Sequence, residues 1–212
     1  MAVDLTELLT PATTAVLTME LQRGVVGDRG AIPALQAEVA RRGVIAQAAR
    51  VVTAARAAGA RVVHCTAEFR ADRAGSSDNA PLLRALARGA PNLVIGTDAT
   101  ALVPEVGPAP SDVVLARRHG LTPFPGTDLD QTLRNLGVET IVATGASLNI
   151  GITGLVMVAV DLGYRCVVVT DAVVGVPAEY GDAVVQHTLA PLATLLVSDQ
   201  VCDVWASPPR PA

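Results

Sequence analysis

Charged residues follow several apolar runs of this sequence, and they are the positions with the clearest chemical potential. Glu20 follows one run, Glu68 follows the next, and Arg117 and Arg118 follow a third. Two carboxyl groups that share a partly desolvated site cannot both ionise at low cost, so the pKa of one of them should rise. A carboxyl that stays protonated near neutral pH is what a general acid requires. The pattern therefore predicts acid-catalysed chemistry, with an arginine as the clamp for a substrate carboxylate.

The second apolar run offers two other reactive side chains, Cys65 and His64. Cys65 is an alternative nucleophile, although a buried thiol that acts as a small apolar residue is the favoured interpretation. His64 lacks the Asp-x-His spacing or the second nearby histidine that a metal site would need. We therefore expect neither a metal nor a cofactor. Asp171, at the end of a later run, is expected to accept structural hydrogen bonds.

Short apolar runs alternate with amphipathic stretches along the chain. Strands are predicted at residues 14–19, 61–66, 112–115, 140–144, 165–170 and 193–198. Helices are predicted at residues 31–58, 81–88, 127–137, 149–162 and 178–189. This order indicates an α/β fold of three layers around a mostly parallel sheet of about six strands. A ligand site in such a fold lies outside the C-terminal ends of the strands, where Glu20 and Glu68 fall.

The length and composition are consistent with that fold. The 212 residues fit a single domain, with residues 1–13 and 206–212 as peripheral tails. Half of the residues are apolar and only 2% are aromatic, which suits a parallel sheet buried on both faces by helices. The net charge of −4 without a basic stripe argues against nucleic-acid binding. Because no long apolar run or signal segment occurs, we expect no membrane partner and a cytoplasmic location, and three scattered cysteines predict no disulfide framework.

Several motifs occur in a fixed order and together carry a resemblance to a known family. They are TMELQ at residues 18–22, FPGTDLD at 124–130, TGASLNIG at 144–151, AVDLGY at 159–164 and VTDA at 169–172. The chain resembles the isochorismatase-like cysteine hydrolases over nearly its whole length, from about Thr14 to about Val204. The resemblance implies the same α/β fold, a small-molecule substrate and a homo-oligomer, either a dimer or a tetramer. It also implies a cis peptide bond between Ala146 and Ser147.

Many members of that family use an Asp-Lys-Cys triad in which the thiolate attacks an amide carbon. Matched residue by residue, this chain differs at all three positions. Glu20 replaces the aspartate, Arg118 replaces the lysine and Gly151 replaces the cysteine. Glycine has no nucleophile, so the thioester route is closed at this position. Arginine does not release a proton, so Arg118 is expected to bind an anion and not to carry protons.

The true isochorismatases are similar to this chain because they too have glycine at the cysteine position. They cleave a vinyl ether, and an acid protonates the enol-ether carbon before water adds. By this resemblance Glu20 is the acid and Glu68, where the family has glutamine, is a second carboxylate that positions water. The helix that starts near Asn149 would direct its N-terminus toward an anionic ligand. The remaining substrate-binding candidates lie in the family motifs: Gln22, Phe124, Ala146, Ser147, Asn149 and Ile150.

Three functions remain open at this point. The first is a hydrolase of a small carboxylate-bearing metabolite that works without a cysteine nucleophile, by acid-catalysed vinyl-ether cleavage. The second is a non-catalytic small-molecule binder or structural homologue, in which Glu20 forms a structural ion pair with Arg118. The third is an amidase that uses Cys65 or a bound water.

Overall fold

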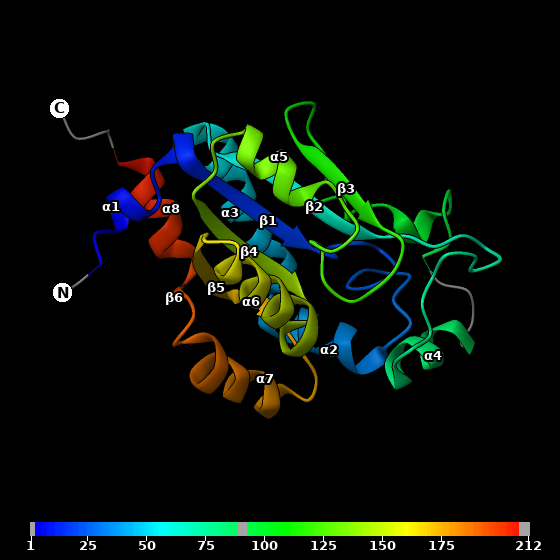
Figure 1. Cartoon of the computed structure of the whole chain (residues 1–212). Helices are drawn as coiled ribbons and strands as arrows, with labels where there is room; N and C mark the ends of the chain where they lie inside the picture. Colours follow the sequence, from blue (N-terminus) through cyan, green and yellow to red (C-terminus); the bar gives the residue numbers. More distant parts are fainter. Residues whose placement is uncertain (1–2, 89–92, 208–212) are drawn as a thin grey trace.

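A computed structural model describes residues 3–88 and 93–207 of the chain. It contains a six-stranded, all-parallel sheet with the strand order β3-β2-β1-β4-β5-β6. The strands are β1 (Thr14–Met19), β2 (Arg61–Ala67), β3 (Val113–Arg117), β4 (Thr140–Ala146), β5 (Arg165–Val174) and β6 (Thr194–Leu196). The predicted α/β architecture is confirmed, and β1 lies near the middle of the sheet, as Figure 1 shows.

Helices cover both faces of the sheet and divide the interior into two apolar cores. One core joins the strands to α2 (Pro33–Arg42), α3 (Val44–Ala58) and α8 (Ser198–Ala206). The other joins the opposite face to α5 (Leu129–Asn135), α6 (Thr153–Asp161) and α7 (Ala178–Val184). Alternate residues of β1 serve the two sides, with Val16 in the first core and Leu17 in the second, because strand side chains alternate between faces.

The predicted helix at residues 31–58 is in fact two helices. Gly43 has a φ of 65°, ends α2 and precedes α3, because a left-handed residue stops the regular hydrogen-bond ladder. The predicted helix at residues 149–162 also has two parts, a π-helical turn η3 (Leu148–Ile152) followed by α6. A second π-helical turn, η4 (Val185–Leu189), follows α7. The remaining helices are α1 (Leu5–Leu8), η1 (Pro11–Thr13), α4 (Pro81–Arg88) and η2 (Asp98–Thr100).

The two ends of the described chain pack against each other. The indole Nε1 of Trp205, on α8, donates a 2.8 Å hydrogen bond to the carbonyl of Leu9. Leu8 and Leu9 are both buried in the first core, so the prediction that residues 1–13 form a peripheral tail is wrong for these two. The predicted tail at 206–212 lies mostly outside the described residues.

Candidate functional site

Glu20 leaves β1 in a left-handed conformation, with a φ of 51°. Such a φ is uncommon for a residue other than glycine, and residues of this kind cluster at functional sites. The backbone nitrogen of Glu20 donates a 2.9 Å hydrogen bond to the carbonyl of Cys65, which anchors it to β2. The turn brings the Glu20 carboxyl to the C-terminal end of β3.

Arg117 is the last residue of β3, and its guanidinium forms a salt bridge with the Glu20 carboxylate. Both side chains are largely buried, with exposed fractions of 9% for Arg117 and 14% for Glu20. Nη1 of Arg117 also donates a 2.9 Å hydrogen bond to the carbonyl of Gly120. Its Nε is buried and has no hydrogen-bond partner among the described residues. The Glu20 carboxylate therefore has one cationic partner, the Arg117 guanidinium. The Nε–H of that guanidinium donates to no acceptor among the described residues.

The prediction that Arg118 is the inward arginine is wrong. Neighbouring residues at a strand end point to opposite sides, and Arg117 shares its side of β3 with Leu115, which packs against the second core. The side chain of Arg118 is 62% exposed and approaches the carboxylate of Glu68 at 3.4 Å. Spacing within the family motif predicted that Arg118 points toward Glu20. The alternation of side chains along β3 instead places Arg117 on that side.

Glu20 and Glu68 do not share a pocket, contrary to the prediction. Glu68 lines a surface groove of about 410 Å³ together with Thr66, Val114 and Ala116. These residues alternate with those that face Arg117, so the groove belongs to the other side of the sheet. The Glu20 carboxyl therefore meets a cation and not a second carboxylate.

Burial nevertheless raises the pKa of Glu20, and the neighbouring Arg117 offsets only part of this effect. The pKa of a carboxyl rises in such a place because the ionised form loses its hydration. Burial also raises the pKa of the nearby Cys65 thiol to about 12, with Arg117 lowering it and Glu20 raising it further. Burial thus acts in the same direction on both groups, against the ionised form of the carboxyl and of the thiol.

The cysteine-equivalent position, Gly151, faces the side chain of Met19. A Cβ at residue 151 would lie 3.1 Å from Met19 Cε and 3.2 Å from the Ala146 carbonyl oxygen. Gly145, with a φ of 110°, packs so closely on the Met19 backbone that any side chain there would collide with it. The predicted cis bond between Ala146 and Ser147 is present. Met19 therefore occupies the space in front of the position at which a nucleophile would stand.

The predicted substrate-binding residues fall into two groups. Gln22 is fully buried, and its amide bonds only the backbone of Ala67 and Thr100, at 2.8–2.9 Å, so it braces loops and has no donor left for a ligand. Phe124 is also buried and stacks on Tyr164 with a centroid distance of 6.3 Å. Ala146 is buried at the end of β4. The partly exposed group lies around the π-helical turn: Ser147, Asn149 and Ile150.

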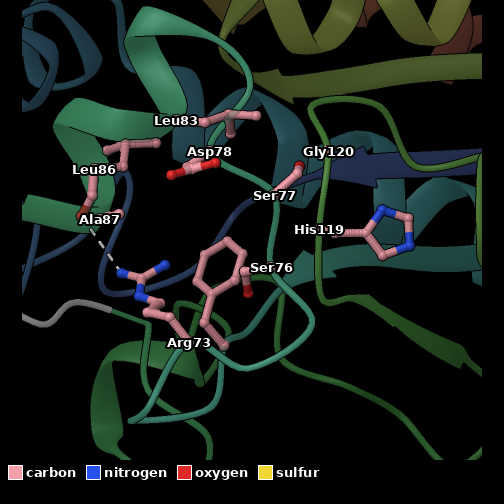
Figure 2. A pocket seen from close by; sticks show the side chains of 10 residues that line it. Arg73, Ser76, Ser77, Asp78, Leu83, Leu86, Ala87, His119 and Gly120 are labelled. Carbon is pink, nitrogen blue, oxygen red and sulfur yellow. Dashed lines mark hydrogen bonds between the residues drawn. The ribbon is translucent and has the colours of Figure 1, made fainter.

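A cavity of about 260 Å³ borders the loop that follows β3, and Figure 2 shows its lining. Gly120, whose carbonyl accepts from Arg117, belongs to its wall. The apolar lining comes from Phe69 and from α4: Leu83, Leu86 and Ala87. The polar lining comes from two loops: Arg73, Ser76, Ser77, Asp78 and His119. A small ligand in this cavity would lie one loop away from Glu20.

Comparisons with known proteins are consistent with this geometry. The isochorismatase domain profile matches residues 14–200. The chain belongs to the isochorismatase family. An uncharacterized isochorismatase family protein, YwoC of Bacillus subtilis, is 40% identical over 75 residues, which cover 35% of this chain and 39% of that protein. The ureidoacrylate amidohydrolase RutB of Methylobacterium radiotolerans is 31% identical over 77% of this chain and 68% of its own length.

A solved structure gives the same result. An isochorismatase family protein from Burkholderia thailandensis superposes with a TM-score of 0.76 and 27% identity, covering 92% of this chain and 97% of the other. The matched region includes all six strands and hence the elements that carry Glu20, Arg117 and Gly151. The family match therefore covers the part of the chain that contains the candidate site.

Sequence reasoning missed one buried polar network in this isochorismatase-family protein. His64 bridges Thr18 Oγ1, 2.8 Å from its Nδ1, and Asp112, 3.1 Å from its Nε2. Asp112 also accepts from Arg56 of α3 at 2.5 Å and from the Ala109 amide at 2.8 Å. The partners come from three strands or their ends and a helix, so no local spacing signals them. The network lies toward the first core and holds β1, β2 and the start of β3 to α3.

Two further findings concern other polar residues. Asp171 accepts hydrogen bonds from the amide and the hydroxyl of Ser198 at 2.8 and 2.7 Å, which confirms its predicted role as a structural acceptor. Within residues 3–88 and 93–207, no group of three or more His, Cys, Asp or Glu side chains is arranged to hold a metal ion. Across the same ranges, no helix has both the length and the apolar character needed to cross a bilayer.

Proposed function

We propose that this isochorismatase-family hydrolase cleaves a small carboxylate-bearing molecule by general acid catalysis, with Glu20 as the acid. The observation that carries the proposal is the largely buried carboxyl of Glu20, whose pKa burial raises and which pairs with Arg117 at the C-terminal edge of the sheet. A general acid needs its proton near the working pH, and burial is a common way to keep it. Arg117 takes the anion-stabilising role that the motif spacing assigned to Arg118.

The reaction that suits such an acid is vinyl-ether cleavage. The Glu20 proton moves to the terminal carbon of the enol ether, and the resulting oxocarbenium ion accepts a water molecule. The hemiketal then collapses, its carbon–oxygen bond breaks, and a ketone and an alcohol leave. A proton from the added water returns to the Glu20 carboxylate, which Arg117 stabilises in the interval. No step needs a thiol.

An amide hydrolase is the less favoured reading. RutB carries the name of an amidohydrolase, but thiolate attack from residue 151 is closed to this chain because that residue is glycine. Cys65 is a poor substitute, because a thiol with a pKa of about 12 is almost entirely protonated at neutral pH. The other open option is an amidase that uses a bound water, and nothing in the arrangement of Glu20 and Arg117 favours it.

A non-catalytic binder is the second candidate, and one observation favours it. Met19 fills the space before Gly151, and the Glu20–Arg117 pair is closed at the bottom of the site. In that reading the ion pair is structural, and the cavity beside it binds a ligand without converting it.

Pyruvate release from isochorismate distinguishes the two candidates. We expect the wild-type protein to release pyruvate, and Glu20→Gln to lower the rate by about 10²- to 10⁴-fold, the usual contribution of a general acid. The rate of the wild type should fall as pH rises through the pKa of Glu20, because the acid form is lost. Glu179→Gln, an exposed change on α7, is the matched control and should keep the wild-type rate.

Two results would count against the proposal. Equal rates for Glu20→Gln and the wild type would remove Glu20 as the acid. An absence of pyruvate release from the wild type would remove isochorismate as the substrate and would favour the non-catalytic candidate.

A further inference from the structure

The cavity beside Arg117 has one cationic and one anionic side chain in its lining, and neither has an opposite charge as a partner among the described residues. The guanidinium of Arg73 lies 4.4 Å from the centroid of the Phe69 ring, and its one hydrogen bond within residues 3–88 and 93–207 is long, 3.5 Å, to the carbonyl of Leu86. No carboxylate of residues 3–88 or 93–207 lies within salt-bridge distance of it. Arg73 is thus held in place by a ring and a carbonyl, and its charge remains uncompensated.

Asp78 is the corresponding anion. Arg84 donates a 2.9 Å hydrogen bond to the backbone carbonyl of Asp78 and not to its carboxylate. No salt bridge to the Asp78 carboxylate occurs within the described part of the chain. In Figure 2 the carboxylate of Asp78 and the guanidinium of Arg73 lie well apart, with Asp78 nearer to Leu83.

Two other arginines near the cavity do have carboxylate partners. Arg70, in the same loop as Arg73, forms a 2.7 Å salt bridge with Asp72. Arg118, which follows β3, contacts Glu68 at 3.4 Å. These two arginines thus have carboxylate partners, whereas Arg73 and Asp78 have no oppositely charged partner among the described residues.

We propose that this cavity binds a small dipolar molecule that has a carboxylate at one end, an ammonium or other N–H donor at the other, and a short apolar body between them. Arg73 pairs with the carboxylate through parallel hydrogen bonds, and Asp78 accepts from the donor. The apolar body lies against Phe69, Leu83 and Leu86. A volume of about 260 Å³ suits a ligand of metabolite size.

The inference rests on the proposed function only where it takes the bound molecule to be the substrate, which would then carry an N–H donor that isochorismate lacks. The position of the cavity supports that step, because its wall residue Gly120 accepts a hydrogen bond from Arg117, the partner of Glu20. Binding itself needs no turnover, so a test that measures binding alone separates the two proposals.

The test uses three probes of similar length: 6-aminohexanoate with both charged ends, hexanoate with only the carboxylate, and hexylamine with only the ammonium. Dissociation constants are measured by NMR titration of the whole protein. We expect 6-aminohexanoate to bind the wild type at least about 10-fold more tightly than either single-ended probe, because a hydrogen bond to a charged group contributes about 1.5–3 kcal/mol.

Each variant should affect one end of the ligand. Arg73→Gln should weaken the binding of 6-aminohexanoate and hexanoate by about 10-fold and leave the affinity for hexylamine unchanged. Asp78→Asn should weaken the binding of 6-aminohexanoate and hexylamine and leave the affinity for hexanoate unchanged. Arg73→Lys should retain part of the affinity lost in Arg73→Gln, because lysine keeps the positive charge but cannot donate two parallel hydrogen bonds to a carboxylate. Arg70→Gln is the matched control in the same loop and should bind all three probes like the wild type.

The outcomes separate the proposals cleanly. Selective binding without pyruvate release would support the cavity, remove isochorismate as the substrate and favour the non-catalytic candidate. Equal affinities for the three probes, or identical affinities in Arg73→Gln and the wild type, would overturn the dipolar site even if Glu20-dependent turnover were found. The melting temperature of each variant shows that a lost affinity does not come from a lost fold.

Discussion

Two buried carboxyl groups at neighbouring strands of the sheet show opposite electrostatic behaviour. Asp112, just before β3, accepts hydrogen bonds from Arg56, the Ala109 amide and His64. Burial alone would raise the pKa of Asp112, but these donors lower it below its ordinary value. Glu20 has one side-chain partner, Arg117, and burial raises its pKa.

The difference separates a structural carboxylate from a chemical one. A carboxylate with several donors is stabilised in its charged form and holds elements together. A buried carboxyl with a single charged partner keeps its proton to a higher pH than an exposed carboxyl, and acid catalysis needs that property. The contrast is consistent with a structural role for the Asp112 network and supports the proposal that Glu20 transfers a proton.

The largest effect should come from breaking the Asp112 network. Asp112→Asn removes the charge that Arg56 and His64 face, and removal of one partner of a buried pair costs about 3–5 kcal/mol of the free energy of unfolding. Urea unfolding followed by circular dichroism measures this loss. Asp199→Asn, at an exposed salt bridge with Arg50, is the control and should cost less than about 1 kcal/mol. Equal small losses in both variants would mean that the network is not structural.

A smaller effect should follow removal of the cation beside Glu20. Arg117→Met leaves a carboxyl that can neutralise itself by taking a proton, so we expect a loss of about 1–2 kcal/mol near pH 7.5. The difference from the wild type should shrink at a second, more acidic pH, because protonation of Glu20 as pH falls through its pKa removes the ion pair. Unfolding at the two pH values measures it, with the exposed Arg118→Met as the control. A loss that stays constant with pH would contradict the raised pKa.

The pH dependence of stability provides a third test, at His64. Burial lowers the pKa of His64 below 6.5, and Asp112 offsets only part of that effect. The unfolded chain then binds a proton that the folded chain does not, so this contribution to stability is complete above about pH 6.5 and decreases as pH falls below it. His64→Gln should remove this part of the dependence of the free energy of unfolding on pH, and the change His187→Gln, at an exposed histidine, should keep it. An unchanged slope in His64→Gln would assign the pH dependence to another group.

The smallest effect is expected at Cys65. Its thiol has a pKa of about 12, so only about one molecule in 10⁴ is a thiolate at pH 8, and a thiol reagent should not label it in the folded protein. Labelling should instead be confined to the partly exposed Cys202. Cys65→Ala should keep pyruvate release within about two-fold of the wild type, since no step of the proposed reaction uses a thiol. A large loss of activity in Cys65→Ala would revive the amidase alternative.

Much of the architecture was predictable from the sequence because strand and helix periods are local signals. The predicted strand at residues 14–19 is observed with the same bounds, and β5 was found but continues to Val174, beyond the predicted end at 170. The helix pair α2 and α3 was read as one helix, since its apolar pattern continues across Gly43 and only the backbone angle shows the break. The helix α8 was missed, because it begins where a strand was expected to end.

The site was less predictable, for geometrical reasons. Motif spacing located Glu20 and Gly151, but a one-residue difference in register decides whether Arg117 or Arg118 points inward. The left-handed conformation of Glu20 could not be predicted, because glutamate is not a residue type that favours a positive φ. Arg73 and Asp78 lie in a loop whose sequence resembles any solvated segment, and only the cavity gives them significance.

The contact between Trp205 and Leu9 has an optical consequence. Trp205 is the only tryptophan in the chain, and its indole bonds the backbone near the start of β1 through a helix close to the other end of the sequence. Its emission spectrum therefore reports whether the two ends of the chain are docked, because an indole that loses such a buried contact meets water. Circular dichroism reports the helices of the whole molecule. A fluorescence transition at lower urea than the dichroism transition would reveal fraying of the ends before the sheet opens.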